Sequence, residues 1–115
     1  MSTTRVTKYT VYPDGFDTFV HSDKYLWTLT VEERNPDEGL WSVKDAFGCL
    51  NRRGERDYEP LPSSRTNRWL KSHRFPLDEA LKIAEKYVEK VVVNGRTARQ
   101  ASEWVAARNA MEGRA

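Results

Sequence analysis

The sequence predicts an α+β fold: an antiparallel β-meander of three to four strands, followed by two or three helices packed on one face. Three observations predict it. Segments in the first half alternate apolar or β-branched residues with polar ones, turn-forming residues separate these segments, and the second half repeats apolar residues at helical spacing. Strands followed by helices are typical of this class. With 115 residues the chain has the length of one domain, which we predict to span residues 1–115.

Three strands are predicted, over residues 5–12, 25–34 and 40–50. The first (RVTKYTVY) is dense in β-branched and aromatic residues and ends at a Pro-Asp-Gly turn signal. The second (YLWTLTVEER) alternates most clearly, and the third begins with the same alternation after a loop of turn formers. We expect the second and third strands to pair antiparallel, with Trp27 and Trp41 on or near one face.

The chain after the meander is predicted to form a charged loop over 51–66 and helices over 67–73, 77–91 and 97–111. The helix at 77–91 has the strongest signal, because a proline precedes it, acidic residues complement its dipole and apolar residues recur every three or four positions. Thr97 is the expected N-cap of the last helix. The run Val91–Val93 is rich in β-branched residues, so the sequence leaves open whether it is helix or strand.

The predicted core takes aromatic and aliphatic side chains from both strands and helices. Burying each is worth roughly 1.5–3 kcal/mol. The four tryptophans are therefore explained without a ligand. The inward-facing set is Tyr25, Trp27, Leu29, Val31, Trp41, Val43, Leu81, Ala84, Val88 and Trp104. The opposite face of the same strands is expected to be exposed and carries Thr28, Thr30, Glu32, Ser42 and Lys44.

A single cysteine, Cys49, excludes an internal disulfide and fits a reducing compartment. The chain has no apolar run near the roughly 18 residues that would span a bilayer, and its first residues have no apolar core of a signal peptide. We therefore expect a cytoplasmic protein, in the host cytoplasm if it is phage-encoded, with no membrane partner.

The residues that carry enzymatic chemistry are sparse. Two histidines and one cysteine cannot form the usual zinc motifs, and no glycine-rich phosphate loop is present. Acidic residues cluster mainly in predicted loops, which predicts no metal site. The sequence leaves open a dyad of Cys49 with His21 or His73, but a lone cysteine beside Phe47 and Leu50 is more typical of a small buried hydrophobe. We expect neither a cofactor nor an enzyme.

Basic residues concentrate in the second half of the chain. Residues 63–115 carry eleven Lys and Arg against six Asp and Glu, whereas residues 1–62 carry eight against eleven. Within the segment 52–74, seven cations accompany aromatic residues, a combination that can track phosphates and stack on bases. Three acidic residues dilute this charge. The candidate nucleic-acid-binding residues are Arg52, Arg53, Arg56, Arg65, Arg68, Trp69, Lys71 and Arg74.

One set of positions carries a resemblance to a known family: Trp27, the run Trp41-Ser42-Val43, the run Phe75-Pro76-Leu77-Asp78-Glu79-Ala80-Leu81, and Ala84. In these positions the chain resembles the AP2-like DNA-binding domains at the N-termini of some phage integrases. The resemblance covers about half of the chain and implies a β-meander backed by one helix. The arginine ladder expected on the exposed sheet face is missing here, so no base-reading residue carries over. As a whole the chain also resembles small Arg- and Ala-rich uncharacterised proteins of actinobacteria and their phages, which implies an accessory protein of a mobile element.

These observations predict a small non-enzymatic binding or accessory protein that acts through protein–protein contact. Its partner is expected to be another protein or a second copy of the chain. The alternative is a nucleic-acid-binding accessory protein that uses the basic segment 52–74.

Overall fold

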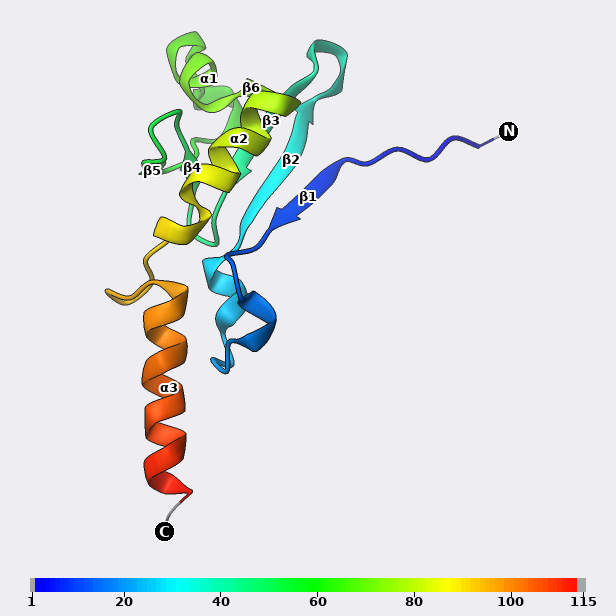
Figure 1. Ribbon diagram of the computed structural model, residues 1–115. Coiled ribbons are helices and arrows are strands. Elements are labelled where there is room, and N and C mark those ends of the chain that lie inside the picture. Colours follow the sequence, from blue (N-terminus) through cyan, green and yellow to red (C-terminus); the bar gives the residue numbers. More distant parts are fainter. Residues whose placement is uncertain (1, 114–115) are drawn as a thin grey trace.

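The computed structural model describes residues 2–113 and confirms the α+β class, with a six-stranded antiparallel sheet and three α-helices (Figure 1). The strands are β1 (Lys8–Val11), β2 (Leu29–Asn35), β3 (Leu40–Lys44), β4 (Cys49–Leu50), β5 (Arg56–Asp57) and β6 (Phe75–Pro76). The helices are α1 (Asn67–His73), α2 (Leu77–Tyr87) and α3 (Ala98–Glu112). Strands β1 to β5 follow one another across the sheet as a meander, and β6 pairs with β3.

The long strands pair in a register that places apolar side chains on one face. Val31 of β2 stands opposite Tyr9 of β1 on one side and Val43 of β3 on the other. The far edge of β3 is divided between two short strands, because Lys44 pairs with Cys49 of β4 and Trp41 pairs with Phe75 of β6. Strand β6 therefore joins the end of α1 and the start of α2 to the sheet.

The predicted strand at 25–34 starts later than expected, because Lys24–Trp27 form a 3-10 turn and β2 begins at Leu29. Strand alternation does not apply within a turn, so the placement of Tyr25 in the core is wrong: its side chain is 64% exposed. Trp27 does point inward, and its indole N–H donates to the carbonyl oxygen of Arg96 at 2.9 Å.

Two tight turns break up the predicted strand at 40–50 and the predicted loop at 51–66. The carboxylate of Asp45 accepts from the backbone N–H groups of Phe47 and Gly48, which reverses the chain between β3 and β4. The side-chain oxygen of Asn51 then accepts from the N–H groups of Arg53 and Glu55, and the chain returns as β5. Such side-chain-capped turns explain why residues expected to form a loop add a strand to the sheet.

Helix α2 covers one face of β2 and β3 and forms the core with them. Its inner residues Ala80, Ile83 and Ala84 are buried in the same cluster as Val31 and Val43, at the spacing of one helix face. The helix is shorter than predicted: a 3-10 turn at Val88–Lys90 follows it, and the chain leaves this turn at Val91 in an extended conformation. An isolated bridge between Val93 and Arg96 then closes the next turn, so Val91–Val93 is neither a continuation of the helix nor a named strand.

Among the helices of residues 2–113, α2 makes the main contacts with β2 and β3, whereas the expectation was two or three helices packed on one face. Helix α3 contacts the 3-10 turn at Lys24–Trp27 through its first turns, where Ala98, Ala101 and Ser102 are buried. The rest of α3 extends away from the body (Figure 1). The placement of Trp104 in the core is therefore wrong, and its side chain is 46% exposed between the guanidinium groups of Arg96 and Arg108.

The face of the sheet opposite α2 is also covered, contrary to the expectation that it is exposed. Ser42 is fully buried and Thr28 is 9% exposed, while Thr30, Glu32 and Lys44 are half-buried. Lys44 shares its side of β3 with Ser42 and lies 3.8 Å from Glu59. The segment after β5, expected to be a solvated loop, therefore lies over this face.

Candidate binding groove

The candidate site lies where α1 meets the sheet, and Glu59 organises it. Glu59 Oε1 accepts hydrogen bonds from Arg34 Nη2 and Arg74 Nη2, both at 2.7 Å. Lys44 Nζ lies 3.8 Å from Glu59 Oε2, and Arg65 Nη2 lies 3.4 Å from Glu59 Oε1. We call these five residues the Glu59 cluster. The side chain of Arg74 is 3% exposed, so its charge depends on this carboxylate rather than on water.

The backbone of β2 places one of these cations. The pairing of β2 with β3 shifts register between Glu33 and Asn35, which leaves Arg34 without a partner residue in β3. Such a bulge redirects a side chain, and Arg34 reaches Glu59 from here. The cluster therefore ties β2, β3, the chain after β5 and the end of α1 to one carboxylate.

The charges of the cluster set the ionisation of Glu59. Burial on its own raises the pKa of Glu59, but the hydrogen bond from Arg74 and the charges of Arg34, Arg74 and Lys44 outweigh it. The pKa of Glu59 consequently lies below its ordinary value of 4.5. Glu59 is therefore a carboxylate at neutral pH, as its cationic partners require.

Helix α1 has only seven residues, too few to be stable alone, so side-chain contacts hold it in place. The hydroxyl of Thr66 accepts from the N–H of Trp69 at 3.1 Å and caps its first turn. At the other end His73 Nε2 lies 2.7 Å from Asp57 Oδ2 of β5. The ring of Trp69 stacks on His73, with ring centroids 4.4 Å apart. The His73–Asp57 contact thus ties the end of α1 to β5, and the other two contacts hold the helix itself in shape.

The predicted nucleic-acid-binding residues are distributed among several partners rather than presented together. Arg65 and Arg74 belong to the Glu59 cluster, and their guanidinium carbons lie 5.7 and 4.9 Å from the centroid of the Trp69 ring. Trp69 is half-buried and already stacked on His73, so much of its ring is occupied by protein contacts.

The remaining cations of the predicted set divide into paired and unpaired ones. Arg52 Nε donates to Glu79 Oε1 at 2.7 Å, Arg53 pairs with Glu55 at 2.7 Å, and Arg56 pairs with Asp45. Arg68 and Lys71 make no ion pair with any residue in the described range 2–113. Both of these side chains belong to α1.

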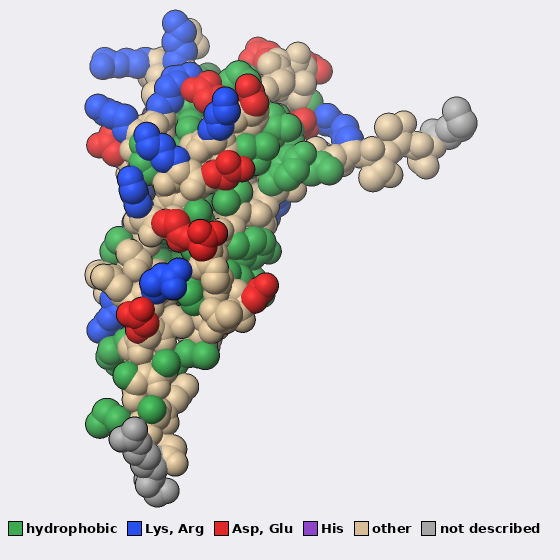
Figure 2. All heavy atoms as spheres, in the orientation of Figure 1, with side chains coloured by type: hydrophobic (Ala, Val, Ile, Leu, Met, Phe, Trp, Pro, Cys, Tyr) green, Lys and Arg blue, Asp and Glu red, His purple; other side chains and the backbone are tan. Residues whose placement is uncertain are grey.

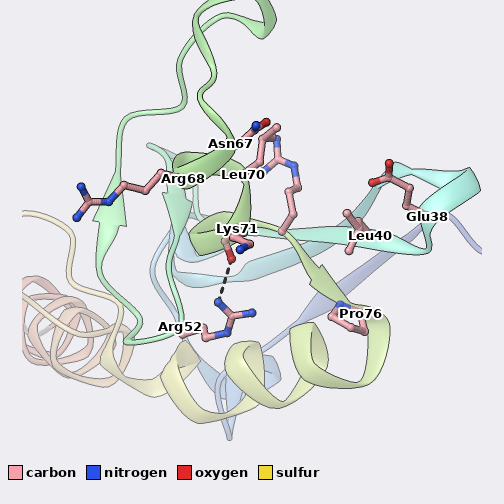
Figure 3. A pocket seen from close by; sticks show the side chains of 9 residues that line it. Glu38, Leu40, Arg52, Asn67, Arg68, Leu70, Lys71 and Pro76 are labelled. Carbon is pink, nitrogen blue, oxygen red and sulfur yellow. Dashed lines mark hydrogen bonds between the residues drawn. The ribbon is translucent and has the colours of Figure 1, made fainter.

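An open groove of about 840 Å³ runs beside α1 (Figure 3). One face of α1 forms a wall of it, because Asn67, Leu70 and Lys71 follow one another at the spacing i, i+3 and i+4, and Arg74 extends this wall just after the helix ends. The β2–β3 connection forms the facing wall, and Arg52 of the turn after β4 and Pro76 of β6 close one end (Figure 3). The lining residues are Asn67, Leu70, Lys71 and Arg74, then Glu38 and Leu40, then Arg52 and Pro76, with Arg68 at the rim.

The groove combines positive charge with an apolar surface. Four lining residues are Arg or Lys and one is acidic, while Leu40, Leu70 and Pro76 are apolar. Arg52 donates to the carbonyl oxygen of Lys71 at 2.9 Å across the end of the groove, and Figure 3 shows the Arg68 side chain pointing away from Leu40 and Pro76. Lys and Arg side chains also gather on the surface at this end of the molecule (Figure 2).

The lining provides cations and apolar contacts rather than a reactive group. Among the described residues that line the groove, none is a serine, threonine, cysteine or histidine. Within residues 2–113, no group of three or more His, Cys, Asp or Glu could hold a metal ion, and no helix is long and apolar enough to cross a membrane.

Cys49 lies in β4 with its side chain fully buried. Burial raises the pKa of the Cys49 thiol, the charge of Glu59 raises it further, and Arg74 only partly offsets them. A buried thiol with a raised pKa is a poor nucleophile. The structure thus gives Cys49 the surroundings of a packing residue.

Comparisons with known proteins return no match: no family model fits the chain, and neither a curated protein nor a solved structure is detectably similar to it. The groove and its neighbouring residues are therefore the features of this chain that indicate a function.

Sequence reasoning missed several residues that build the site. Glu59 lies in a stretch of mixed charge that has no periodicity, so nothing in the sequence indicates that it gathers four cations. Glu38, Leu40 and Pro76 belong to separate segments that meet only through the pairing of β3 with β6. The one available signal is the i, i+3, i+4 spacing of Asn67, Leu70 and Lys71 on the predicted helix at 67–73.

Proposed function

We propose that this protein is a non-enzymatic binding protein and that the groove beside α1 takes an acidic, apolar segment of a partner protein. The lining of the groove carries the proposal. Its apolar side chains lie among cations, and Lys71 has no acidic partner within residues 2–113. A segment that places a carboxylate next to a leucine-like side chain complements both features.

The ion pairs of the basic segment favour this function over nucleic-acid binding. Five of its seven cations already face carboxylates of the same chain, namely Arg52, Arg53, Arg56, Arg65 and Arg74. The two that remain, Arg68 and Lys71, would give a salt slope of only about −1.8 on duplex DNA, far below that of proteins with six to ten phosphate contacts. The role as an accessory protein of a phage or mobile element stays a prediction.

The test is a selection of random twelve-residue peptides displayed on phage, carried out against the full chain. We expect enriched peptides to carry Asp or Glu beside Leu, Ile or Phe, and to bind as synthetic peptides in a fluorescence anisotropy titration. Lys71→Glu should abolish that binding because it reverses an unpaired charge on the wall of the groove. Lys86→Glu makes the same charge change at an exposed position of α2 outside the groove and should leave the affinity unchanged.

Two results would contradict the proposal: no enrichment of acidic apolar peptides, or equal binding of such peptides by the Lys71→Glu variant. Labelled single-stranded and duplex DNA form a second arm of the experiment. If DNA binds at low salt with a slope steeper than two phosphates allow, the nucleic-acid alternative replaces the protein-binding one.

A further inference from the structure

We propose that two copies of this chain associate through the free edges of their β1 strands, which pair antiparallel and continue the sheet. This surface is separate from the groove, so the inference does not rest on the proposed function. Strand β1 stands at one end of the strand order, and no described strand pairs with its outer side. In Figure 1 it forms the outer border of the sheet, and the chain before it continues outward in an extended form.

The chain before β1 is held in line with the strand. The carbonyl oxygen of Thr7 accepts from the N–H of Glu33 at 2.9 Å. The guanidinium of Arg5 donates to both carboxylate oxygens of Glu33, at 2.6 and 3.1 Å. The extended segment therefore starts before Lys8, and it offers a longer pairing edge than the four residues of β1 itself.

The hydrogen bonds to β2 determine which backbone groups remain available. In an antiparallel pair, residues that exchange hydrogen bonds alternate with residues that do not. Because Thr7 bonds to β2, Tyr9 and Val11 also direct their backbone groups toward β2. The N–H and C=O groups of Lys8 and Thr10 consequently point to the free side of the strand, and both residues are exposed.

One register of a symmetric pair satisfies these groups best. Centred on Tyr9, it sets Lys8 opposite Thr10 of the second copy and Val6 opposite Tyr12, and the outward groups of Lys8 and Thr10 bond to each other. A register centred on Lys8 would place two like charges directly opposite, which is destabilising. A register centred on Thr10 would pair only residues 8–12, because the chain turns at Pro13.

The favoured register also covers exposed apolar side chains. Val6 is 56% exposed and Tyr12 is 48% exposed, and each lies beside the other copy's strand in this pairing. Proteins usually shield a free edge with proline, a bulge or an inward charge, and residues 5–12 contain neither proline nor a bulge in their pairing with β2. Lys8 is an edge charge of the kind that shields a free strand, and it stands across from Glu32 of its own sheet. Since one strand from each copy makes a small interface, the dimer is expected to be weak.

The first test measures the mass of the full chain by light scattering from micromolar to millimolar concentration. Thr10→Pro removes an outward N–H and leaves the bonds between β1 and β2 in place, whereas Thr10→Val keeps the N–H. We expect the wild type and Thr10→Val to dimerise alike, and Thr10→Pro to raise the dimer dissociation constant about 30-fold or more, because two symmetric hydrogen bonds are lost. A wild type that stays monomeric at millimolar concentration, or a Thr10→Pro variant that dimerises equally well, would overturn the proposal.

The second test reads the register by single cysteine substitutions at Lys8, Tyr9 and Thr10 under mild oxidation. Two copies of residue 9 face each other as a non-hydrogen-bonded pair with Cα atoms about 4.5 Å apart, within disulfide range. Two copies of residue 8, or of residue 10, lie roughly 9 Å apart, beyond that range. Only Tyr9→Cys should therefore give a crosslinked dimer, since the native Cys49 is buried. Crosslinking of Lys8→Cys or Thr10→Cys instead would refute the register.

Discussion

Replacing Glu59 by glutamine keeps the shape of the side chain and removes the charge that holds the Glu59 cluster together. The two hydrogen bonds from Arg34 and Arg74 then run to a neutral amide oxygen instead of a carboxylate, so they no longer join opposite charges. Arg74, almost fully buried, then keeps a charge without a counterion. Breaking a buried ion pair in this way costs about 3–5 kcal/mol. Because the side chain of Glu59 is 15% exposed, water softens the loss, and we expect about 3 kcal/mol.

The loss of stability in Glu59→Gln should depend on pH in a definite direction. The pKa of Glu59 is lower in the folded chain than the ordinary value of 4.5. Such a carboxyl stabilises the fold fully above the pKa of the unfolded chain, and this stabilisation is lost as the pH falls through the lower folded pKa. The difference in unfolding free energy between wild type and Glu59→Gln should therefore be largest near neutral pH and shrink as the pH drops below 4.5.

Urea unfolding followed by tryptophan fluorescence measures both effects, at neutral and at acid pH. Glu85→Gln is the matched control, because Glu85 is exposed on α2 and makes no ion pair among the described residues. It should change the free energy of unfolding by less than about 0.5 kcal/mol. If Glu59→Gln behaves like this control, or if its deficit does not change with pH, the carboxylate does not organise the site as described.

Two further pairs of substitutions test the packing. Trp41→Ala should lower the free energy of unfolding by about 3–5 kcal/mol, because its side chain is buried. Trp104→Ala should lower it by about 1 kcal/mol or less, because its side chain is exposed. Equal losses in a thermal unfolding series would contradict the assignment of Trp41 to the core and Trp104 to the surface. Gly54→Ala should destabilise strongly, because a methyl group there would overlap the ring of Tyr87 at a positive φ of 75°, whereas Gly95→Ala has a φ of 77° and open space and should lose only about 1 kcal/mol. Similar melting temperatures for the two glycine variants would show that Tyr87 does not lie against this turn.

Patterns of neighbouring residues correctly predicted the start of α2, the N-cap of α3 and the buried face of β2. The proline and acidic residues before the apolar spacing of 77–91 placed the start of α2 at Leu77. The N-cap at Thr97 is present as a reciprocal capping box with Gln100. The alternation of Leu29 and Val31 likewise indicated the buried face of β2. Continuing the same alternation back to Tyr25 was wrong, because Lys24–Trp27 form a 3-10 turn and not a strand.

The site depends on contacts between distant residues, which one sequence does not reveal. Glu59 and Arg34 are 25 positions apart, and both stand among other charged residues that a solvated loop would explain equally well. Arg74 follows a predicted helix whose surface was expected to be basic, so its burial had no sequence signal. The groove itself requires β6 to pair with β3, and a two-residue strand is too short to carry a pattern.

The extension of α3 away from the sheet has an energetic consequence. The groove lies beside α1 at one end of an elongated molecule with extents of 58 × 38 × 22 Å, and the exposed turns of α3 lie at the other (Figure 1). Residues that share no partner and lie more than about 10 Å apart contribute independently to a free energy. The effects of substitutions at Lys71 and at Trp104 on the free energy of unfolding should therefore add. The groove end and the α3 end of the molecule can each change without affecting the stability contributed by the other.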